Sequence, residues 1–210
     1  SGALDAGVLA RLIAALPQGA PGATAAHKRY DAAACAVEIP ADVGFCALGH
    51  NLYALGSSYS GACPVLSSLV SYGYLWNMVR VQGGAYGTGM NVRRSGDIFC
   101  YSYRDPNLDN TRAVFSAVAD FIEDFAAQGM PLDDIIIGAV NTTDPLLDPA
   151  GVCESQCVRA LKGVTPEELA RTRHELLATK PADLAAMAGV LRKYAREGKF
   201  CTFSGTKGGA

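Results

Sequence analysis

The sequence predicts an α+β fold, and three observations support this. Apolar residues recur at helical spacing over long stretches of the second half, between clear start and stop signals. Two earlier segments, residues 33–52 and 86–103, have the pattern of extended chain. The 210 residues contain no linker, low-complexity tract or short-period repeat, so we expect a single domain over residues 1–210.

The N-terminal quarter predicts a helix followed by extended chain. Apolar residues at 4–16 fall on one stripe of a helix, and the Pro- and Gly-containing residues 17–22 end it. Loose alternation over residues 33–52 predicts one long strand or two strands joined at Pro40, because proline interrupts a hydrogen-bonded ladder. Residues 51–60 are polar and contain glycine, which indicates a loop.

The middle of the chain predicts a helix and a β-hairpin. The helix starts near Pro64, and the pair Gly83-Gly84 ends it, because paired glycines permit the left-handed backbone that closes a helix. Beyond them the pattern changes to two strands within residues 86–103, joined by a turn at 93–97.

The second half is mostly helical. Asn110-Thr111 is the expected cap of a strongly periodic helix that Gly129 ends, and Thr165-Pro-Glu-Glu168 is a capping box with proline at the first helical position. The other expected elements are helices at 132–140, 152–161, 165–179 and 181–196, a loop at 141–151, a strand at 200–203 and a frayed tail at 204–210.

Composition excludes several classes of protein. Half of the residues are apolar and 18% are charged, as in a globular domain with a sizeable core. The net charge of -2 gives no electrostatic reason to expect nucleic acid or an anionic membrane as a partner. No apolar run reaches the length of a bilayer span, and no signal peptide is visible at the N-terminus.

The seven cysteines favour reduced, buried thiols over a disulfide framework, because their number is odd and their spacing is loose. A reduced intracellular compartment is therefore a better expectation than secretion. We expect Cys153 and Cys157, four apart on a helix, to be small core residues. Cys63 begins a helix, where the dipole can lower a thiol pKa, although no histidine is close to it in sequence. The cysteines are Cys35, Cys46, Cys63, Cys100, Cys153, Cys157 and Cys201.

The organising segment of the chain is the corner where the first long helix passes through Gly83-Gly84 into a strand. Arg80 is expected in the last turn of that helix, and Tyr86 follows just past the turn. An arginine near a helix C-terminus is ordinary complementation of the helix dipole. A corner that presents both an arginine and a tyrosine is less ordinary, and it marks a candidate site.

Two motifs carry a resemblance to a known family. Leu75-Trp-Asn-Met-Val-Arg-Val-Gln-Gly-Gly-Ala-Tyr-Gly87 resembles part of the C-terminal half of pitrilysin/insulinase-type zinc peptidases, in the presequence-protease (falcilysin-like) branch. Ser102-Tyr-Arg-Asp-Pro-Asn107 resembles a second motif of that branch. The similarity in layout runs over about residues 31–203. It implies a helix-backed, antiparallel-rich sheet of the metallopeptidase/processing-peptidase type.

The resemblance also implies a function. In that family four such domains form a hollow, two-halved peptidase that degrades unstructured peptides, and this chain would be the fourth. Carried over, Arg80 and Tyr86 reach across the chamber toward a zinc site on the missing N-terminal half. Tyr86 would stabilise the oxyanion and Arg80 would orient the substrate, with Gly84 and Ala85 as further substrate contacts.

The chain itself is not expected to hold the metal. The zinc motif His-x-x-Glu-His of such enzymes is absent, and His27, His50 and His174 are interpreted as surface or packing residues. We therefore expect no cofactor or metal in this chain, no peptidase activity from it alone, and a zinc-bearing half as its partner. That half is either upstream in the same polypeptide or a separate subunit.

Three alternatives stay open. An arginine at a helix end followed by a Gly-Gly turn occurs in many α/β proteins without any function. A non-catalytic structural or peptide-binding subunit of the same fold is the main rival. An independent enzyme that uses Cys63 is the third.

The sequence also predicts roles for the residues around the corner. Tyr72, Tyr74 and Trp76 are expected to be packing residues, and Arg104 is expected to pair with Asp105 to fix a strand–helix turn.

Overall fold

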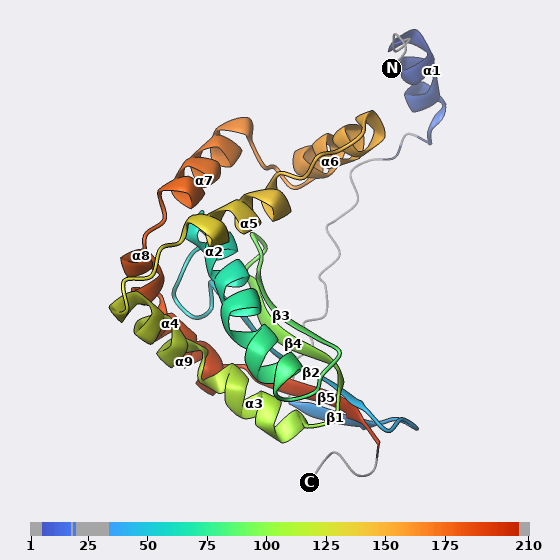
Figure 1. The fold of residues 1–210 in the computed structure, drawn as a ribbon. Coiled ribbons are helices and arrows are strands. Elements are labelled where there is room, and N and C mark those ends of the chain that lie inside the picture. Colours follow the sequence, from blue (N-terminus) through green and yellow to red (C-terminus); the bar gives the residue numbers. More distant parts are fainter. Residues whose placement is uncertain (1–5, 18, 20–33, 206–210) are drawn as a thin grey trace.

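The computed structural model describes residues 6–17, 19 and 34–205 and has a mixed sheet covered by helices on one face (Figure 1). The strand order is β1-β5-β2-β4-β3. All neighbouring strands pair antiparallel except β1 and β5, which run parallel. The antiparallel-rich sheet predicted from the sequence is confirmed. The strands are β1 (Cys35–Glu38), β2 (Gly44–Asn51), β3 (Gly87–Val92), β4 (Asp97–Asp105) and β5 (Lys199–Ser204).

The helices form a layer against the sheet and an extension beyond it (Figure 1). Helices η1, α2, α3 and α9 pack on the sheet, while α6 has no buried residue. No helix in the described part of the chain is long and apolar enough to cross a membrane. The helices are α1 (Ala6–Ala15), α2 (Ala62–Ser68), η1 (Leu69–Val81), α3 (Leu108–Ser116), α4 (Val118–Ala127), α5 (Asp133–Thr143), α6 (Pro149–Leu161), α7 (Pro166–Ala178), α8 (Pro181–Ala185) and α9 (Ala188–Glu197).

The sheet has one buried face and one open face. Along β4, Ile98, Cys100 and Ser102 are buried against the helices, while Tyr101 and Tyr103 on the opposite face are exposed. This alternation follows from the period of two of a β-strand. We call the uncovered side the open face; its aromatic residues are Phe45, Phe99, Tyr101, Tyr103 and Phe203.

Several predicted boundaries are wrong for physical reasons. The helix predicted from Asn110 to Gly129 is two helices, because Ala117 leaves helical backbone where α3 packs on η1 and β2 and α4 packs on α8 and α9. Its cap is Asn107, whose side chain accepts a hydrogen bond from the Asn110 N–H. The helix predicted over 181–196 is likewise divided, into α8 and α9.

Other predictions are confirmed. The extended chain of residues 33–52 is interrupted at Pro40, since β1 ends at Glu38 and β2 begins at Gly44. The capping box that opens α7 at Thr165 forms with both reciprocal hydrogen bonds. The predicted start of a frayed tail at Ser204 is wrong, because Ser204, in β5, pairs with Glu38 and is buried; residues 206–210 of that predicted tail lie outside the described residues.

The cysteines are less buried than predicted. Cys46, Cys63 and Cys100 lie in the core, but four others do not, including the predicted core pair Cys153 and Cys157, which is exposed because α6 packs on nothing that would bury it. All seven are free thiols.

Candidate functional site

The candidate site begins in the last turns of η1, which is wound as a π-helix. The Gln82 N–H bonds to the Asn77 carbonyl five residues back, at 2.9 Å. The chain then reverses through Gly84, whose φ of +82° is open to glycine but strained for other residues. A Cβ at Gly84 would lie 3.3 Å from Pro106, so the first motif packs directly on the second.

The second motif fixes the backbone of Tyr86. The Tyr86 N–H bonds to the carbonyl of Tyr103 at 3.0 Å and to that of Arg104 at 3.3 Å. Arg104 has a φ of +51°, which turns the end of β4 toward α3. The next residue, Asp105, is buried and accepts hydrogen bonds from the Asn107 N–H at 2.8 Å and the Thr111 hydroxyl at 2.5 Å.

The predicted ion pair between Arg104 and Asp105 is therefore wrong. The carboxylate of Asp105 is directed into the turn, where backbone and hydroxyl donors satisfy it, whereas Arg104 is exposed. Asp105 still holds the strand–helix turn, because it accepts hydrogen bonds from an uncharged N–H and an uncharged hydroxyl.

The side chains of the corner form a continuous row of ring contacts. The Arg80 guanidinium carbon lies 4.0 Å from the centre of the Trp76 ring and 5.9 Å from that of Tyr86. Tyr86 meets Tyr103 edge to face at 5.9 Å, and Tyr103 meets Phe45 in the same way at 5.2 Å. We call Trp76, Arg80, Tyr86 and Tyr103 the Arg–Tyr cluster. It brings together the two residues that the sequence singled out.

The polar groups of this cluster are available to a ligand. Within the described part of the chain, the Arg80 guanidinium has no carboxylate partner and makes no hydrogen bond, and its stack on Trp76 is its main contact. The Tyr86 side chain is 65% exposed, and its hydroxyl has no hydrogen-bond partner among the described residues. A cation and a phenol donor, side by side and unsatisfied, suit carbonyl or carboxylate oxygens.

The two backbone positions predicted to touch substrate are partly committed to the fold. The Gly84 N–H bonds to the Arg80 carbonyl at 3.0 Å, and the Ala85 N–H bonds to the Val79 carbonyl at 3.1 Å. Gly84 is exposed, but Ala85 is buried. Neither N–H is free to donate to a ligand.

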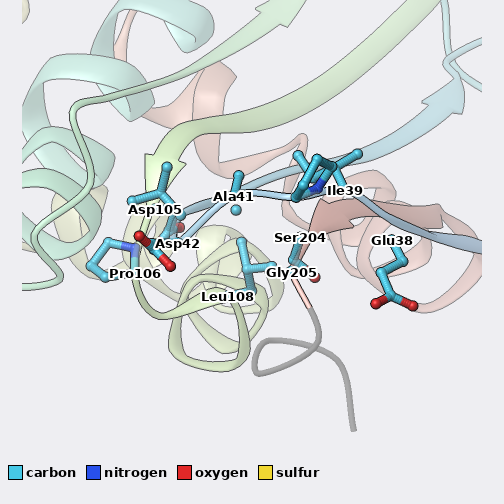
Figure 2. Close-up of a pocket in the computed structure, with 12 residues that line it drawn as sticks. Glu38, Ile39, Ala41, Asp42, Asp105, Pro106, Leu108, Ser204 and Gly205 are labelled. Atoms are coloured by element: carbon cyan, nitrogen blue, oxygen red, sulfur yellow. The ribbon is translucent and has the colours of Figure 1, made fainter.

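Two hollows flank the corner. A cleft of about 840 Å³ lies at the end of the sheet, with Pro106 in its wall, and Figure 2 shows Asp105, Pro106 and Leu108 around it. A groove of about 420 Å³ lies between η1 and the edge strand β3, with Trp76 and Tyr101 in its wall. Because Trp76 contacts Arg80 and Pro106 contacts Gly84, the corner lies between the two hollows.

Trp76 and Tyr72 are the site residues that sequence reasoning missed. Both were predicted to pack inside the domain, yet their side chains are 41% and 69% exposed. Their rings lie 6.5 Å apart. Trp76 lies four residues after Tyr72 and four residues before Arg80, and this spacing was the available signal, since such residues share a helix face. Tyr74, by contrast, packs as predicted, stacked on Phe121 at 4.6 Å.

The cysteine alternative finds no support. Cys63 is fully buried, and burial raises its pKa above the ordinary value, opposite to the lowering expected from a helix start. Among the described residues no histidine hydrogen-bonds to Cys63, whose thiol accepts a hydrogen bond from the Ser60 N–H at 3.5 Å.

The described residues do not fit a zinc centre. Among them, no group of three or more His, Cys, Asp or Glu side chains is placed to hold a metal ion. His50 is half-buried on β2 and contacts its neighbour Asn51, His174 is exposed on α7, and His27 lies outside the described residues.

The fold matches solved structures of peptidase domains. An M16 peptidase inactive domain from Pseudomonas fluorescens superposes with a TM-score of 0.66 at 13% identity, over 97% of this chain and 51% of that one. A putative zinc protease from Bordetella pertussis gives 0.55 at 12% identity, over 76% of this chain and 93% of that one. At these identities the likeness concerns the fold alone.

Residues 35–203 match the family model of the PreP C-terminal domain. The chain belongs to that family. Its curated relatives include presequence protease 1, chloroplastic/mitochondrial, from Arabidopsis thaliana, which is 35% identical over 73% of this chain and 14% of its own length. Protein HypA from Clostridium perfringens is 31% identical over 76% of this chain and 16% of its own length.

Membership of the PreP C-terminal domain family confirms the resemblance drawn from the two motifs, both of which lie inside the matched region. Two of the chain's relatives, from Arabidopsis thaliana and Emericella nidulans, are named presequence proteases, which are peptidases. This chain spans about a sixth or less of the length of the first two relatives described above.

Proposed function

We propose that this chain is the substrate-clamping C-terminal domain, the fourth, of a zinc-dependent endopeptidase that degrades unstructured peptides. The observation that carries the proposal is the Arg–Tyr cluster: an unpaired guanidinium stacked on Trp76, beside an exposed phenol without a partner in the described residues. Its setting inside a PreP C-terminal domain, between two hollows, supports a peptide as the ligand.

Tyr86 is proposed to stabilise the transition state. When water attacks a peptide carbonyl, the carbonyl oxygen gains negative charge, and a fixed O–H donor stabilises that charge most strongly where bulk water is excluded. The Tyr86 backbone is held by two carbonyls of the second motif and its ring rests on Tyr103, so the hydroxyl is placed before the substrate arrives.

Arg80 is proposed to orient the substrate. Its guanidinium carries several donors in one plane, which suits successive carbonyls or a carboxylate of an extended peptide. The stack on Trp76 limits the rotation of the side chain, so less freedom is lost on binding. Of the two neighbouring backbone positions, Gly84 is exposed and can make van der Waals contact with the peptide, whereas Ala85 is buried and the N–H groups of both are used within the fold.

The metal belongs to another part of the enzyme in this proposal. The described residues form no metal site, and the chain spans 14–16% of the length of its relatives, which leaves room for a zinc-bearing N-terminal half. Closure of the two halves would bring the Arg–Tyr cluster to the substrate. The rest of the polypeptide, or a copurifying subunit, should contain His-x-x-Glu-His; absence from both would overturn this division of labour.

The decisive experiment is Tyr86→Phe in the intact peptidase that contains this chain. Loss of an oxyanion donor should lower kcat by about 10²–10³-fold. Tyr53→Phe is the matched control, because its hydroxyl bonds to the Arg94 carbonyl at the far end of β2 and should leave kcat within about twofold. A Tyr86→Phe rate within about twofold of the parent would refute the oxyanion role.

The same experiment separates the rival function. If Tyr86→Phe left hydrolysis unchanged while Arg80→Ala weakened peptide binding by about tenfold or more, the chain would be a peptide-binding, non-catalytic domain of this fold. Isothermal titration with a non-cleavable peptide measures that binding.

A further inference from the structure

Two cysteines face each other across the parallel strands at the edge of the sheet. Cys35 on β1 is the direct register partner of Cys201 on β5, and both are free thiols. Opposed residues of neighbouring strands project to the same face, and such strands lie about 4.8 Å apart. That spacing lies within the Cα separations that disulfides span, about 4.4–6.8 Å. The spacing of the two backbones is therefore compatible with a disulfide between them.

The pair is also open to a reagent. Cys35 is exposed at the first residue of the edge strand, and Cys201 is partly exposed. The Cys35 thiol donates a hydrogen bond to Cys201, which raises the pKa of Cys35 above its ordinary value. Cys35 therefore holds its proton more firmly than an ordinary thiol does, so Cys201 is assigned the first attack.

The buried cysteines lack these properties. Burial raises the pKa of Cys46 to about 11 and that of Cys100 to about 12, so both stay protonated and shielded. Cys153 and Cys157 are exposed, but they lie one turn apart on helix α6 and do not face each other across paired strands. The chain thus has one pair that combines opposed strands with access.

We infer that Cys35 and Cys201 form an oxidisable dithiol whose reaction partner is a small disulfide of the glutathione type. The Cys201 thiolate attacks one sulfur of oxidised glutathione, forms a mixed disulfide and releases one glutathione thiolate, which takes up a proton. Cys35 then loses its proton and attacks the Cys201 sulfur, and the second glutathione leaves. The two protein thiols lose two electrons and two protons, and oxidised glutathione gains them.

The bond would join the first strand of the sheet to the last. β1 is an edge strand of four exposed residues, held to the sheet only by its pairing with β5. A covalent tie would fix this edge and restrict the unfolded chain, which stabilises the folded state. Cys201 shares its cross-strand row with Ala47 and Tyr101, so the tie lies on the open face. This inference does not depend on the proposed peptidase function.

The test incubates the full chain under native conditions in buffers of oxidised and of reduced glutathione. After acid quenching and unfolding, free thiols are counted and disulfide-linked peptides are mapped by mass spectrometry. In oxidised glutathione the parent should yield a disulfide-linked peptide pair that joins Cys35 to Cys201, whatever adducts form on the exposed Cys153 and Cys157. Cys35→Ser should instead retain one glutathione on Cys201, because the resolving thiol is gone.

The double variant Cys153→Ser/Cys157→Ser is the control for exposed cysteines elsewhere, and it should form the same cross-link as the parent. The urea midpoint should rise on oxidation in the parent and in this control, but not in Cys35→Ser. Three results would overturn the inference: no loss of thiols, stable glutathione adducts on both strands of the parent without a cross-link, or a cross-link confined to Cys153 and Cys157.

Discussion

The hydroxyl of Tyr194 offers a direct test of how the sheet that carries the site is held together. Tyr194 lies on α9, fully buried, and its hydroxyl accepts a hydrogen bond from the Cys100 N–H at 2.8 Å and donates one to the Leu48 carbonyl at 2.7 Å. Cys100 and Leu48 are register partners on the central strands β4 and β2. One oxygen atom thus joins both strands to the helix layer.

The expected cost of Tyr194→Phe follows from those two bonds. The substitution removes only the oxygen and leaves the ring, so it opens almost no cavity. It removes the oxygen that accepts from the Cys100 N–H and donates to the Leu48 carbonyl, in a region that water does not reach. A buried polar group without a partner costs about 1–3 kcal/mol, and a carbonyl less than an N–H. We expect the free energy of unfolding to fall by about 2–4 kcal/mol.

Urea unfolding of the purified chain at pH 7 measures this cost. Tyr53→Phe is the matched control: its hydroxyl also bonds to a backbone carbonyl, but the side chain is 48% exposed and water can replace the bond. It should cost less than about 1 kcal/mol. Equal costs for the two variants would refute the reasoning.

The difference in free energy of unfolding between the parent and Tyr194→Phe should depend on pH. Burial raises the pKa of Tyr194 well above its ordinary value of 10.0, so the folded state keeps the proton where the unfolded state loses it. The neutral Tyr194 therefore makes its full contribution to the free energy of unfolding below pH 10.0, and this contribution declines as the pH rises above that value. The difference in stability between parent and Tyr194→Phe should narrow in that alkaline range.

Further predictions concern the corner and the surface. Gly84→Ala should destabilise the chain by about 1 kcal/mol or more in urea unfolding, because φ is +82° and Pro106 is close, whereas Gly189→Ala on α9, with open space around it, should be neutral or stabilising. Trp76→Ala should lower kcat/KM of the intact peptidase about 2–5-fold through the lost cation–π stack, and an unchanged value would contradict that contact. Arg192→Met should lower the urea midpoint slightly at pH 7. The hydrogen bond from Arg192 lowers the pKa of Glu123, so this difference should vanish as the pH falls through that lowered pKa.

Local chemistry was readable in the sequence. The capping box at Thr165 and the interruption at Pro40 each depend on a few consecutive residues, and both form as predicted. The corner motif was also local: the helix end, the glycine turn and the strand start lie within a dozen residues, so Arg80 and Tyr86 could be singled out together. The resemblance to the presequence-protease branch came from short motifs, and the family match over residues 35–203 confirms it.

Tertiary packing decided the rest. Whether Trp76 is buried or exposed depends on what covers its helix face, and its spacing from Arg80 shows only that the two residues share that face. The periodic pattern of residues 110–129 predicted one helix, but α3 and α4 follow different packing partners and the backbone breaks between them. Periodicity indicates that one face of a helix is buried, but it does not indicate which other element that face packs against.

The strand order is the clearest case. The hydrogen bond from Tyr194 to Leu48 joins positions 146 residues apart. Cys35, on the first strand in the sequence, pairs in register with Cys201, on the last. Such pairings depend on the combined burial of many segments, because no single strand fixes its own neighbour. The sequence by itself singled out Arg80 and Tyr86 as the candidate residues of the corner. Only the folded sheet decided which of them, and which cysteines, lie within reach of one another.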